Sequence, residues 1–369
     1  MRYIISGGGT GGHIYPALAI AKEIKKRDGS SQIYYVGKKN SLEEELVSKA
    51  GLDLKFLPIN GAGLPRKSLS LKTLKSIALL IVGLIKAAFI VKKVRPDIII
   101  ATGGYVCAPI TMAGQLIGVK SLIQEQNAYP GKTNKLLSKK ANAICLNFEE
   151  AEEYFPKDKI LVTGNPIREE FSHANKDLDK KSLDFQIKKP MVLSFGGSGG
   201  QESTNDAILD MLKKHELDFF LLHITGKEHY QKFMELLGSY KNENLKILDY
   251  SHQIPELLPL ADLVIASSSA MTLAEISATG LASILIPKAY TAGDHQSYNA
   301  RSYEKAGASV VIEEKDLNGD VLYNKIQSVL KDEKKKNEMG ANSKKMASPD
   351  GVKKIVDKVF ELIGNKNGF

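Results

Sequence analysis

The stretch Arg2-Tyr3-Ile4-Ile5-Ser6-Gly7-Gly8-Gly9-Thr10-Gly11-Gly12-His13 decides the fold of this 369-residue chain. Its first residues are apolar and β-branched, as in a short buried strand. Five glycines follow before His13, and Pro16 opens a helical segment rich in Ala, Leu and Ile. Because glycine adopts positive φ and has no Cβ, an oxyanion can approach the N–H groups at the start of such a helix. The stretch therefore predicts a strand, an anion-binding loop and a helix.

Three interpretations of this loop compete. Gly7-x-Gly9-x-x-Gly12 matches the dinucleotide fingerprint, but the second expected strand, 32–36, ends in Gly37-Lys38-Lys39. The acid that holds an NAD ribose is missing there, which leaves only an NADP site open. A P-loop is excluded because Gly12 is followed by His13-Ile14 and not by Lys and Ser or Thr. In the third interpretation the loop binds an anion, and His13 either has a chemical role or merely caps the helix.

The same pattern recurs in the second half of the chain. Residues 191–195 read as a strand, 196–200 as a second glycine loop and 202–214 as a helix. Strands alternate with helical segments throughout, which predicts an α/β fold with doubly wound parallel sheets. We expect two Rossmann-like domains, 1–164 and 165–349, with a polar linker at 171–190. A last amphipathic helix within 350–369 is expected to complete the first domain.

Composition narrows the class of protein. With 43% hydrophobic residues the chain can bury two cores. It enters a strand at residue 2 without a signal peptide, and its two cysteines, Cys107 and Cys145, suit a reduced compartment, so we expect a cytoplasmic protein. The seven histidines are scattered and the cysteines lie far apart. No metal-ligand spacing is present, and we expect no metal and no cofactor.

Positive charge is concentrated between residues 61 and 140, where thirteen Lys or Arg face only Asp97 and Glu125. Within this window, residues 71–94 form a strongly apolar helical segment whose longest uninterrupted apolar run, 77–85, is too short to span a bilayer. The segment is either a helix buried against its sheet or part of a 61–95 patch that binds an anionic membrane surface. Nucleic acid is a weaker partner, because stacking aromatic residues are nearly absent from the window.

Ligands of doubly wound sheets gather at the carboxyl ends of the strands. In the first half the residues after the expected strands are glycines, amides and charges: 7–13, 102–105, 125–127 and 164–168. In the second half they are 196–200, 225–227, 249–251, 266–270 and 286–287, followed by a long loop to Asp294-His295-Gln296 and a helix with Asn299.

Seven motifs in this order resemble one family along the whole chain: GGGTGGHIYPALAIA at the start, ATGGYVCAP at 101–109, EQNAYPGKTN at 125–134, VTGNPIR at 162–168, FGGSGG at 195–200, SAMTLAEISATGLASILIP at 269–287 and DHQSYNA at 294–300. They resemble the inverting GT-B glycosyltransferases of peptidoglycan synthesis, which move N-acetylglucosamine from UDP-N-acetylglucosamine onto lipid I to give lipid II. The resemblance implies a GT-B fold, two Rossmann-like domains facing a cleft, on the inner face of the cell membrane.

The resemblance also implies roles for single residues. The first domain would hold the lipid acceptor with Gly9, Thr10, Gly104, Tyr105 and Asn127. The second domain would hold UDP-N-acetylglucosamine, and the residues implied to contact this donor are Thr10, Gly11, Gly12, His13, Asn127, Arg168, Ser198, Ser251, Ala270, Met271, Thr272, Glu275, His295, Gln296 and Asn299. His13 and Glu125 are the catalytic candidates. His13 is the expected base because imidazole has a pKa near neutrality, and Glu125 is the alternative.

Physical chemistry supports parts of this assignment. A glutamate one turn into a helix that starts at a strand end, as Glu275 does, can accept both ribose hydroxyls. The less favoured alternative is an ordinary first-turn acid stabilised by the helix dipole. Thr272 and the N–H groups of that turn would face a phosphate. With no metal site in view, Arg168, hydroxyls and helix N-termini are expected to stabilise the leaving diphosphate.

The chain departs from the family pattern at three positions: Gly199 replaces a common glutamine, Ser251 an apolar residue and Ser267 a basic one. At Gly199 one hydrogen bond to the donor would be missing or replaced by backbone, Ser251 stands at the uracil edge, and Ser267 leaves Arg168 and helix ends to balance the diphosphate. None of the three is a catalytic candidate. Competing functions are another UDP-sugar enzyme, such as a glycolipid synthase or a UDP-N-acetylglucosamine 2-epimerase, an NADP-dependent oxidoreductase, and a membrane-associated scaffold without activity.

Overall fold

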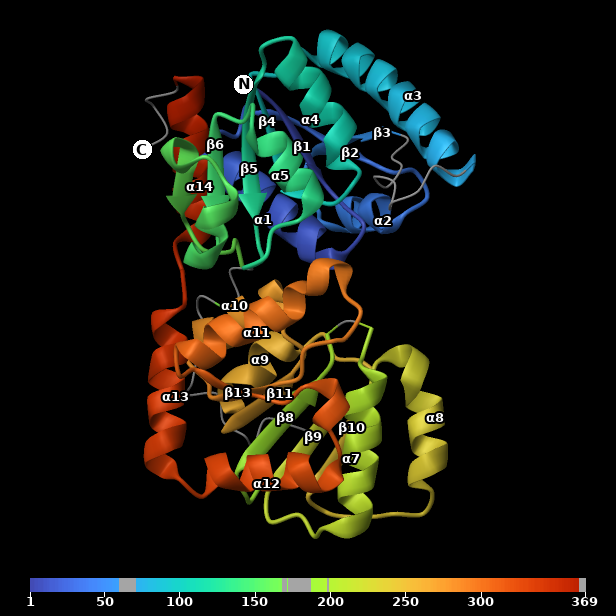
Figure 1. Ribbon diagram of the computed structural model, residues 1–369, viewed down its shortest axis with the longest axis vertical. Coiled ribbons are helices and arrows are strands. Elements are labelled where there is room, and N and C mark those ends of the chain that lie inside the picture. The colour runs from blue at the N-terminus through green and yellow to red at the C-terminus, as the bar shows by residue number, and fades with distance from the viewer. Residues whose placement is uncertain (60–70, 168–170, 172–186, 198, 365–369) are drawn as a thin grey trace. The chain divides into compact units, whose positions relative to one another are not determined.

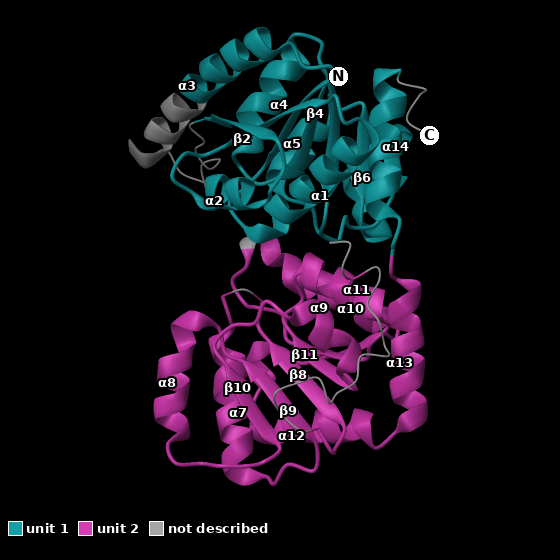
Figure 2. Ribbon diagram, turned by 180° about the vertical axis from the view of Figure 1, so that it is seen from behind, with its two compact units in different colours: residues 1–168, 348–369 teal, residues 169–347 magenta. Residues whose placement is uncertain are grey.

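The computed structural model describes residues 1–59, 71–167, 171, 187–197 and 199–364. The chain divides into two compact units, which Figure 2 shows in teal and magenta. The first unit comprises residues 1–168 together with 348–369, and the second comprises 169–347. The division lies at residue 168, four residues beyond the predicted boundary, and the last helix belongs to the first unit.

The described part of the first unit contains one parallel sheet, in the order β3-β2-β1-β4-β5-β6-β7. Its strands are β1 (Arg2–Gly7), β2 (Gln32–Gly37), β3 (Leu54–Pro58), β4 (Ile98–Gly103), β5 (Lys120–Glu125), β6 (Ala143–Leu146) and β7 (Ile160–Val162). The strand order reverses between β1 and β4, which is where ligands bind in doubly wound sheets. The glycine loop follows β1 and therefore lies at this switch point.

Helices cover both faces of this sheet, as Figure 1 shows. One face packs against α1 (Gly11–Arg27), α2 (Leu42–Lys49) and α14 (Gly351–Ile363), and the other against α3 (Leu71–Val94), α4 (Cys107–Leu116) and α5 (Lys132–Ser138). Side chains alternate along a strand, so Ile5 faces the α1 layer and Ile4 the α3 layer. Both faces are apolar, as a parallel sheet requires.

The C-terminal helix α14 completes the core beside α1. Ile355, Val356, Val359 and Phe360 pack with Tyr3 and other buried residues of β1, β5 and β6. Arg27 at the end of α1 donates to Asp357 and, at 3.4 Å, to the carbonyl oxygen of Lys353. Apolar burial and these charge-assisted hydrogen bonds attach the last helix to the first unit.

Helix α3 has both a face buried against the sheet and an exposed apolar face, the two alternatives that the sequence left open. Ala87, Val91 and Val94 are buried against the sheet with Ile99, so one face is an ordinary core face. Ile81, Val82, Ile85 and Phe89 lie on the outer face, with 51 to 70% of their surface exposed. Among the described residues we found no helix with the length and hydropathy needed to span a membrane. The loop 61–67 lies outside the described residues, as do the side chains of 71–80.

The second unit repeats the topology. In its described part the strands run β10-β9-β8-β11-β12-β13, all parallel. They are β8 (Met191–Phe195), β9 (Phe220–Ile224), β10 (Leu245–Leu248), β11 (Leu263–Ala266), β12 (Ser283–Leu285) and β13 (Ser309–Val311). The helices are α7 (Glu202–Lys214), α8 (Lys227–Leu237), α9 (Ile254–Leu257), α10 (Ala270–Thr279), α11 (His295–Lys305), α12 (Gly319–Leu330) and α13 (Glu333–Lys345). The second glycine loop lies at the switch point between β8 and β11.

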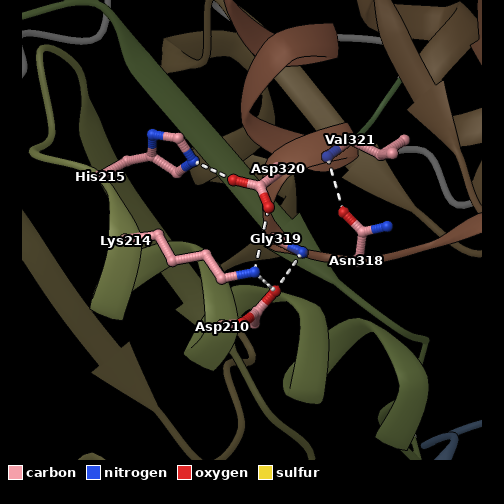
Figure 3. Close-up of polar contacts among 7 residues, drawn as sticks. All are labelled: Asp210, Lys214, His215, Asn318, Gly319, Asp320 and Val321. Atoms are coloured by element: carbon pink, nitrogen blue, oxygen red, sulfur yellow. Dashed lines mark hydrogen bonds and ion pairs between the residues drawn. The ribbon is translucent and has the colours of Figure 1, made fainter.

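A surface network joins α12 to the end of α7 (Figure 3). Lys214 contacts Asp210 at 2.9 Å and Asp320 at 3.0 Å, and Nε2 of His215 lies 2.8 Å from Asp320. Asp210 also accepts the N–H of Gly319 at 2.8 Å, in the first turn of α12. The hydrogen bond from Lys214 is the main cause that lowers the pKa of Asp320. The network adds polar contacts at the surface to the apolar packing of α12 on α7.

Candidate active site

The first glycine loop forms one connected set of hydrogen bonds around His13. The N–H of Gly8 donates to the carbonyl oxygen of Gly103 at 3.1 Å, which joins the loop after β1 to the end of β4. Nδ1 of His13 lies 2.9 Å from the carbonyl oxygen of Gly8 and 3.4 Å from the hydroxyl of Thr10. A carbonyl oxygen only accepts, so Nδ1 must carry the proton of a neutral His13. The basic lone pair is then on Nε2, which fits a general base.

Close backbone packing sets the position of the His13 ring. A Cβ on Gly103 would lie 2.7 Å from Cδ2 of His13, and one on Gly104 would lie 2.1 Å from the oxygen of Gly8. Both glycines have positive φ, +107° and +81°. The motif at 101–109 therefore needs its two glycines for steric reasons, because any side chain there would displace the ring or the loop.

A residue that the sequence did not single out, Glu43, contacts this loop. Its carboxylate accepts the N–H of Gly9 at 2.8 Å, and only 2% of its surface is exposed. The Gly9 amide, expected to bind the acceptor diphosphate, thus donates within the protein. Glu43 is the first of three acids in the first turn of α2, a pattern that sequence reasoning takes for solvent-exposed charge.

Glu125 is buried at the end of β5, with 1% of its surface exposed. One carboxylate oxygen accepts the backbone and side-chain N–H groups of Asn127 at 3.0 and 3.1 Å. The other accepts the N–H of Gly131 at 3.1 Å and Nδ2 of Asn134 at 2.8 Å. Both oxygens therefore act within the 125–134 loop. This geometry supports a role in loop conformation more directly than proton transfer.

The carboxyl-edge loops of the first unit are linked to one another. Gln126 donates to the carbonyl oxygen of Thr102 at 2.6 Å, and Asn147 donates to the carbonyl oxygen of Gln126 at 3.0 Å. Tyr105 is partly exposed beside this network, and Thr10 is exposed at the start of α1. The structure thus brings Gly9 to His13, Gly104, Tyr105, Glu125 and Asn127 to one edge of the first sheet, as their positions after strands predicted.

In the second unit the glycine loop packs on the end of β9. A Cβ on Gly200 would lie 2.0 Å from the carbonyl oxygen of Thr225, and Gly200 has a φ of +73°. Lys288 donates to the carbonyl oxygen of Gly200 at 2.6 Å. Burial lowers the pKa of Lys288, against the opposing effect of nearby Glu314. In this second glycine loop, the ammonium group of Lys288 binds a backbone carbonyl oxygen. In the first glycine loop, the carboxylate of Glu43 binds a backbone N–H.

Lys288 and Glu314, two further residues that the sequence did not indicate, join three loops of the second unit. Glu314 accepts from Gln201 at 2.8 Å, from Ser203 at 2.5 Å and from the N–H of Ala289 at 2.7 Å. A shallow pocket of about 460 Å³ lies here. The contacts join residues that are 25 to 113 positions apart in the sequence, so no local pattern could have shown them.

The turn before α10 has the hydroxyl-rich N-terminus that the sequence predicted. Ser269 caps the helix by accepting the N–H of Thr272 at 3.3 Å, and its hydroxyl lies 2.8 Å from that of Thr272. Ala270 and Met271 share this first turn, and Glu275 is partly buried one turn further on. Ser251, after β10, accepts the N–H of Gln253 at 3.0 Å.

Helix α11 is joined to the same turn by two of the predicted residues. Asn299 is fully buried and donates to the carbonyl oxygen of Ser268 at 3.2 Å. Gln296 accepts the N–H of Lys288 at 3.0 Å, and the hydroxyl of Ser268 donates to its carbonyl oxygen at 2.8 Å. His295 is partly exposed at the start of the helix. Arg168 and Ser198, also predicted here, lie outside the described residues, as does most of the predicted linker.

Two family models match these two units. Residues 3–146 match the glycosyltransferase family 28 N-terminal domain, and residues 191–355 match the glycosyltransferase family 28 C-terminal domain. Together the matches cover most of the chain.

The chain belongs to glycosyltransferase family 28.

Full-length relatives of this family 28 chain agree with that assignment. A protein of Thermoanaerobacter sp. (strain X514) is 45% identical over 359 residues, which cover 96% of this chain and 98% of the relative. It is named UDP-N-acetylglucosamine–N-acetylmuramyl-(pentapeptide) pyrophosphoryl-undecaprenol N-acetylglucosamine transferase. The chain is therefore a glycosyltransferase that uses UDP-N-acetylglucosamine, as the sequence motifs predicted.

Solved structures confirm the GT-B fold. MurG of Acinetobacter baumannii is 24% identical and aligns with a TM-score of 0.79 over 98% of this chain and 99% of that one. The UDP-GlcNAc 2-epimerase of Neisseria meningitidis, solved with UDP-GlcNAc bound, is 13% identical and has a TM-score of 0.69 over 98% of this chain and all of that one. At these identities the likeness shows the fold alone, which transferases and epimerases share.

Among the described residues of this family 28 chain, no three His, Cys, Asp or Glu side chains lie close enough together to hold a metal ion.

Proposed function

We propose that this chain transfers N-acetylglucosamine from UDP-N-acetylglucosamine to the muramoyl sugar of lipid I, undecaprenyl-diphospho-MurNAc-pentapeptide. The products are lipid II, with a β linkage, and UDP, and the reaction is a step of peptidoglycan synthesis. The observation that carries this proposal is the 45% identity, over 96% of the chain, to a transferase whose name states this reaction. The carboxyl-edge residues of both sheets supply groups suited to it.

We assign proton transfer to His13. The acceptor hydroxyl attacks the anomeric carbon, UDP leaves from the opposite face and the configuration inverts. With Nδ1 protonated toward Gly8, Nε2 can take the proton of the attacking hydroxyl. Glu125 is the less suitable base, because four N–H groups already donate to its two oxygens. We propose that Glu125 positions the loop that carries Asn127.

Donor binding is assigned to the second unit. The N-terminus of α10, with Ala270, Met271 and Thr272, would face the diphosphate, and Glu275 one turn later would accept the ribose hydroxyls. Ser251 would lie near uracil, and His295 and Gln296 near the sugar. Asn299 is fully buried, so we assign it to the attachment of α11 and not to direct contact. Arg168 and Ser198 remain donor ligands by analogy, together with Thr10, Gly11, Gly12 and Asn127 of the first unit.

Acceptor binding is assigned to the first unit, through Thr10, Gly104, Tyr105 and Asn127. Gly9, whose N–H already donates to Glu43, would lie beside the acceptor without binding its diphosphate. We further propose that transfer needs no metal, since the α10 N-terminus and its hydroxyl groups can stabilise the leaving diphosphate. Full activity in the presence of EDTA is expected, and loss of activity that Mg²⁺ restores would refute this part.

We also propose a cytoplasmic location at the inner face of the membrane. The outer face of α3 exposes Ile81, Ile85 and Phe89 beside Lys86 and Lys92, a combination that binds anionic lipid surfaces. Changing Lys75, Lys86 and Lys92 to Glu should weaken binding to phosphatidylglycerol vesicles and leave turnover of a soluble acceptor intact. Unchanged vesicle binding would contradict the role of this patch.

The reaction is tested with radiolabelled UDP-N-acetylglucosamine and a lipid I analogue. Label in the lipid product supports the proposal, and label in another glycolipid would indicate a different acceptor. Conversion of the donor to its 2-epimer without transfer would instead identify an epimerase. NADPH should not bind, because the Glu43 carboxylate opposes a dinucleotide diphosphate at Gly9. UDP should raise the melting temperature, as a ligand of the native state does, whereas a scaffold without activity would not respond.

A further inference from the structure

Beyond this reaction, one peptide group of the first glycine loop contacts two side chains in opposite directions. The peptide joining Gly8 and Gly9 donates its N–H to Glu43 at 2.8 Å. The carbonyl oxygen of the same peptide lies 2.9 Å from Nδ1 of His13. Glu43 and His13 thus contact the two ends of a single planar unit, whose atoms rotate together.

We propose that Glu43 is the positioning residue that fixes the tautomer and orientation of His13, acting through the Gly8–Gly9 peptide. This inference rests on the proposed role of His13 as the base. The arrangement resembles a carboxylate that orients a catalytic histidine, except that a peptide group intervenes. A carboxylate also polarises the N–H that it accepts, which makes the carbonyl oxygen of Gly8 a better acceptor for the His13 proton.

The carboxylate selects one of two orientations of this peptide. Gly9 has a φ of +86°, and a peptide between two glycines can rotate with little steric hindrance. If it reversed, its carbonyl oxygen would face the Glu43 carboxylate and its N–H would face His13. The first contact is repulsive. The second would require an unprotonated Nδ1, which places the proton of a neutral His13 on Nε2, and Nε2 could not then act as a base.

The protein has a space shaped for this carboxylate. A Cβ on Gly8 would lie 2.1 Å from Oε1 of Glu43, and a Cβ on Gly37 would lie 3.0 Å from Cβ of Glu43. Two glycines, at the ends of β1 and β2, therefore leave room for a side chain from α2. The other two acids of the same turn contact different groups: Glu44 accepts the N–H of Asn40, and Glu45 pairs with Lys49. Only Glu43 of the three is directed at the loop.

Three substitutions separate geometry from charge. Glu43→Gln keeps an oxygen at the same reach but removes the charge, Glu43→Asp keeps the charge but shortens the side chain, and Glu43→Ala removes both. Glu45→Ala is the matched control, since it removes an exposed acid from the same turn. We expect kcat to fall about 10- to 100-fold in Glu43→Ala and Glu43→Asp, with the KM for UDP-N-acetylglucosamine unchanged. Glu45→Ala should stay within about threefold of the unchanged protein. Glu43→Gln should lower kcat less than Glu43→Ala does, because its amide oxygen still accepts from Gly9 but its NH2 group can also donate to a reversed peptide.

The tautomer is read directly by 15N NMR of histidine-labelled protein, with the His13 signals assigned by their absence in His13→Ala. The unchanged protein and Glu45→Ala should show protonated Nδ1, and Glu43→Ala and Glu43→Gln should each show a mixture of tautomers. An unchanged tautomer in Glu43→Ala, or full kcat in Glu43→Asp, would overturn the proposal. Should Glu43→Ala fail to fold, Glu43→Gln decides it, since an unchanged tautomer in Glu43→Gln would also overturn the proposal.

The spectra do not depend on transfer. If no acceptor is glycosylated but the tautomer follows Glu43 as expected, the proposed function fails and the role of Glu43 stands. If transfer is confirmed but the His13 tautomer is the same with and without Glu43, the proposed function stands and the role of Glu43 fails.

Discussion

The two glycine loops occupy equivalent places in two sheets of the same topology, yet their neighbours differ in charge and in target. After β1, a buried carboxylate accepts a loop N–H, whereas after β8, a lysine donates to a loop carbonyl group. An N–H already bound to a carboxylate is a poor ligand for a diphosphate. A carbonyl group bound by lysine does not compete for an anion. Two glycine-rich loops at equivalent places can therefore support base orientation in one unit and nucleotide binding in the other.

The largest effect is expected for His13→Ala. Loss of the general base should lower kcat about 10²- to 10⁴-fold, because this is the usual contribution of such a group. UDP should still raise the melting temperature, since the nucleotide is assigned to the second loop. Steady-state kinetics and thermal shift on the same variant measure both. Near-normal turnover here, with Glu125→Ala inactive and folded, would move the base to Glu125.

Replacing one glycine of each unit by alanine tests whether the first loop serves transfer and the second binds UDP. Gly104→Ala places a Cβ 2.1 Å from Gly8 O, and Gly200→Ala places one 2.0 Å from Thr225 O, both at positive φ. Each should destabilise the protein by about 2–4 kcal/mol. Gly104→Ala should lose transfer but keep its thermal response to UDP, and Gly200→Ala should lose that response. Equal responses to UDP in the two variants would contradict the comparison.

A buried histidine makes the second unit sensitive to acid. Burial lowers the pKa of His223 to about 3, and its ring nitrogens lie 3.1 Å from the Ser194 hydroxyl and 3.0 Å from Asn205 Oδ1. His223 stays neutral in the fold, while the unfolded chain takes a proton near pH 6.5. The contribution of neutral His223 to the free energy of unfolding is therefore fully present above about pH 6.5. Below that pH the free energy of unfolding falls by up to about 1.4 kcal/mol per pH unit.

Hydrogen exchange of the β8 and β9 amides, corrected for intrinsic rates, should show this loss between pH 7 and pH 5. His223→Gln should remove most of the pH dependence, whatever its effect at neutral pH. A first unit that loses protection at the same pH would show that the two units do not respond separately.

The smallest effect is expected for Asp320→Asn in the network of Figure 3. Its partners are exposed, so water and salt screen the interaction. The melting temperature should fall less than in any other variant, less still at 1 M NaCl, and the response to UDP should not change. A large loss of UDP binding would mean that the packing of α12 on α7 controls the second loop.

Local patterns in the sequence predicted much of the fold. The strand β8 and the helix α7 have the predicted bounds, and α14 lies within the predicted range 350–369, because each is a strong periodic or apolar segment between clear breaks. The strands β3 and β13 were missed. β3 is an edge strand with mostly half-exposed residues that ends at Pro58, and β13 has only three residues. Edge pairing depends on neighbouring strands more than on the strand's own residues.

Local patterns also predicted part of the candidate site. Residues directly after strands could be predicted, since parallel strands bring their carboxyl ends together. Glu43 could not, because it lies 34 residues from its partner Gly9 and its neighbours Glu44 and Glu45 make it look like surface charge. Lys288 and Glu314 were missed for the same reason. Residues that orient other residues act over long sequence distances and leave no local signal.

The position of α14 in the sequence determines when the first unit can complete its core during synthesis. The first unit is built from residues 1–168 and 348–369, so the ribosome releases the whole second unit before α14 can pack. Until then Tyr3 and Ile5 lack the cover of Val356 and Phe360. Such exposed apolar surface is prone to aggregation, and domains generally fold as units in the order of synthesis. The nascent first unit therefore depends on rapid packing of α14, which is made after the second unit.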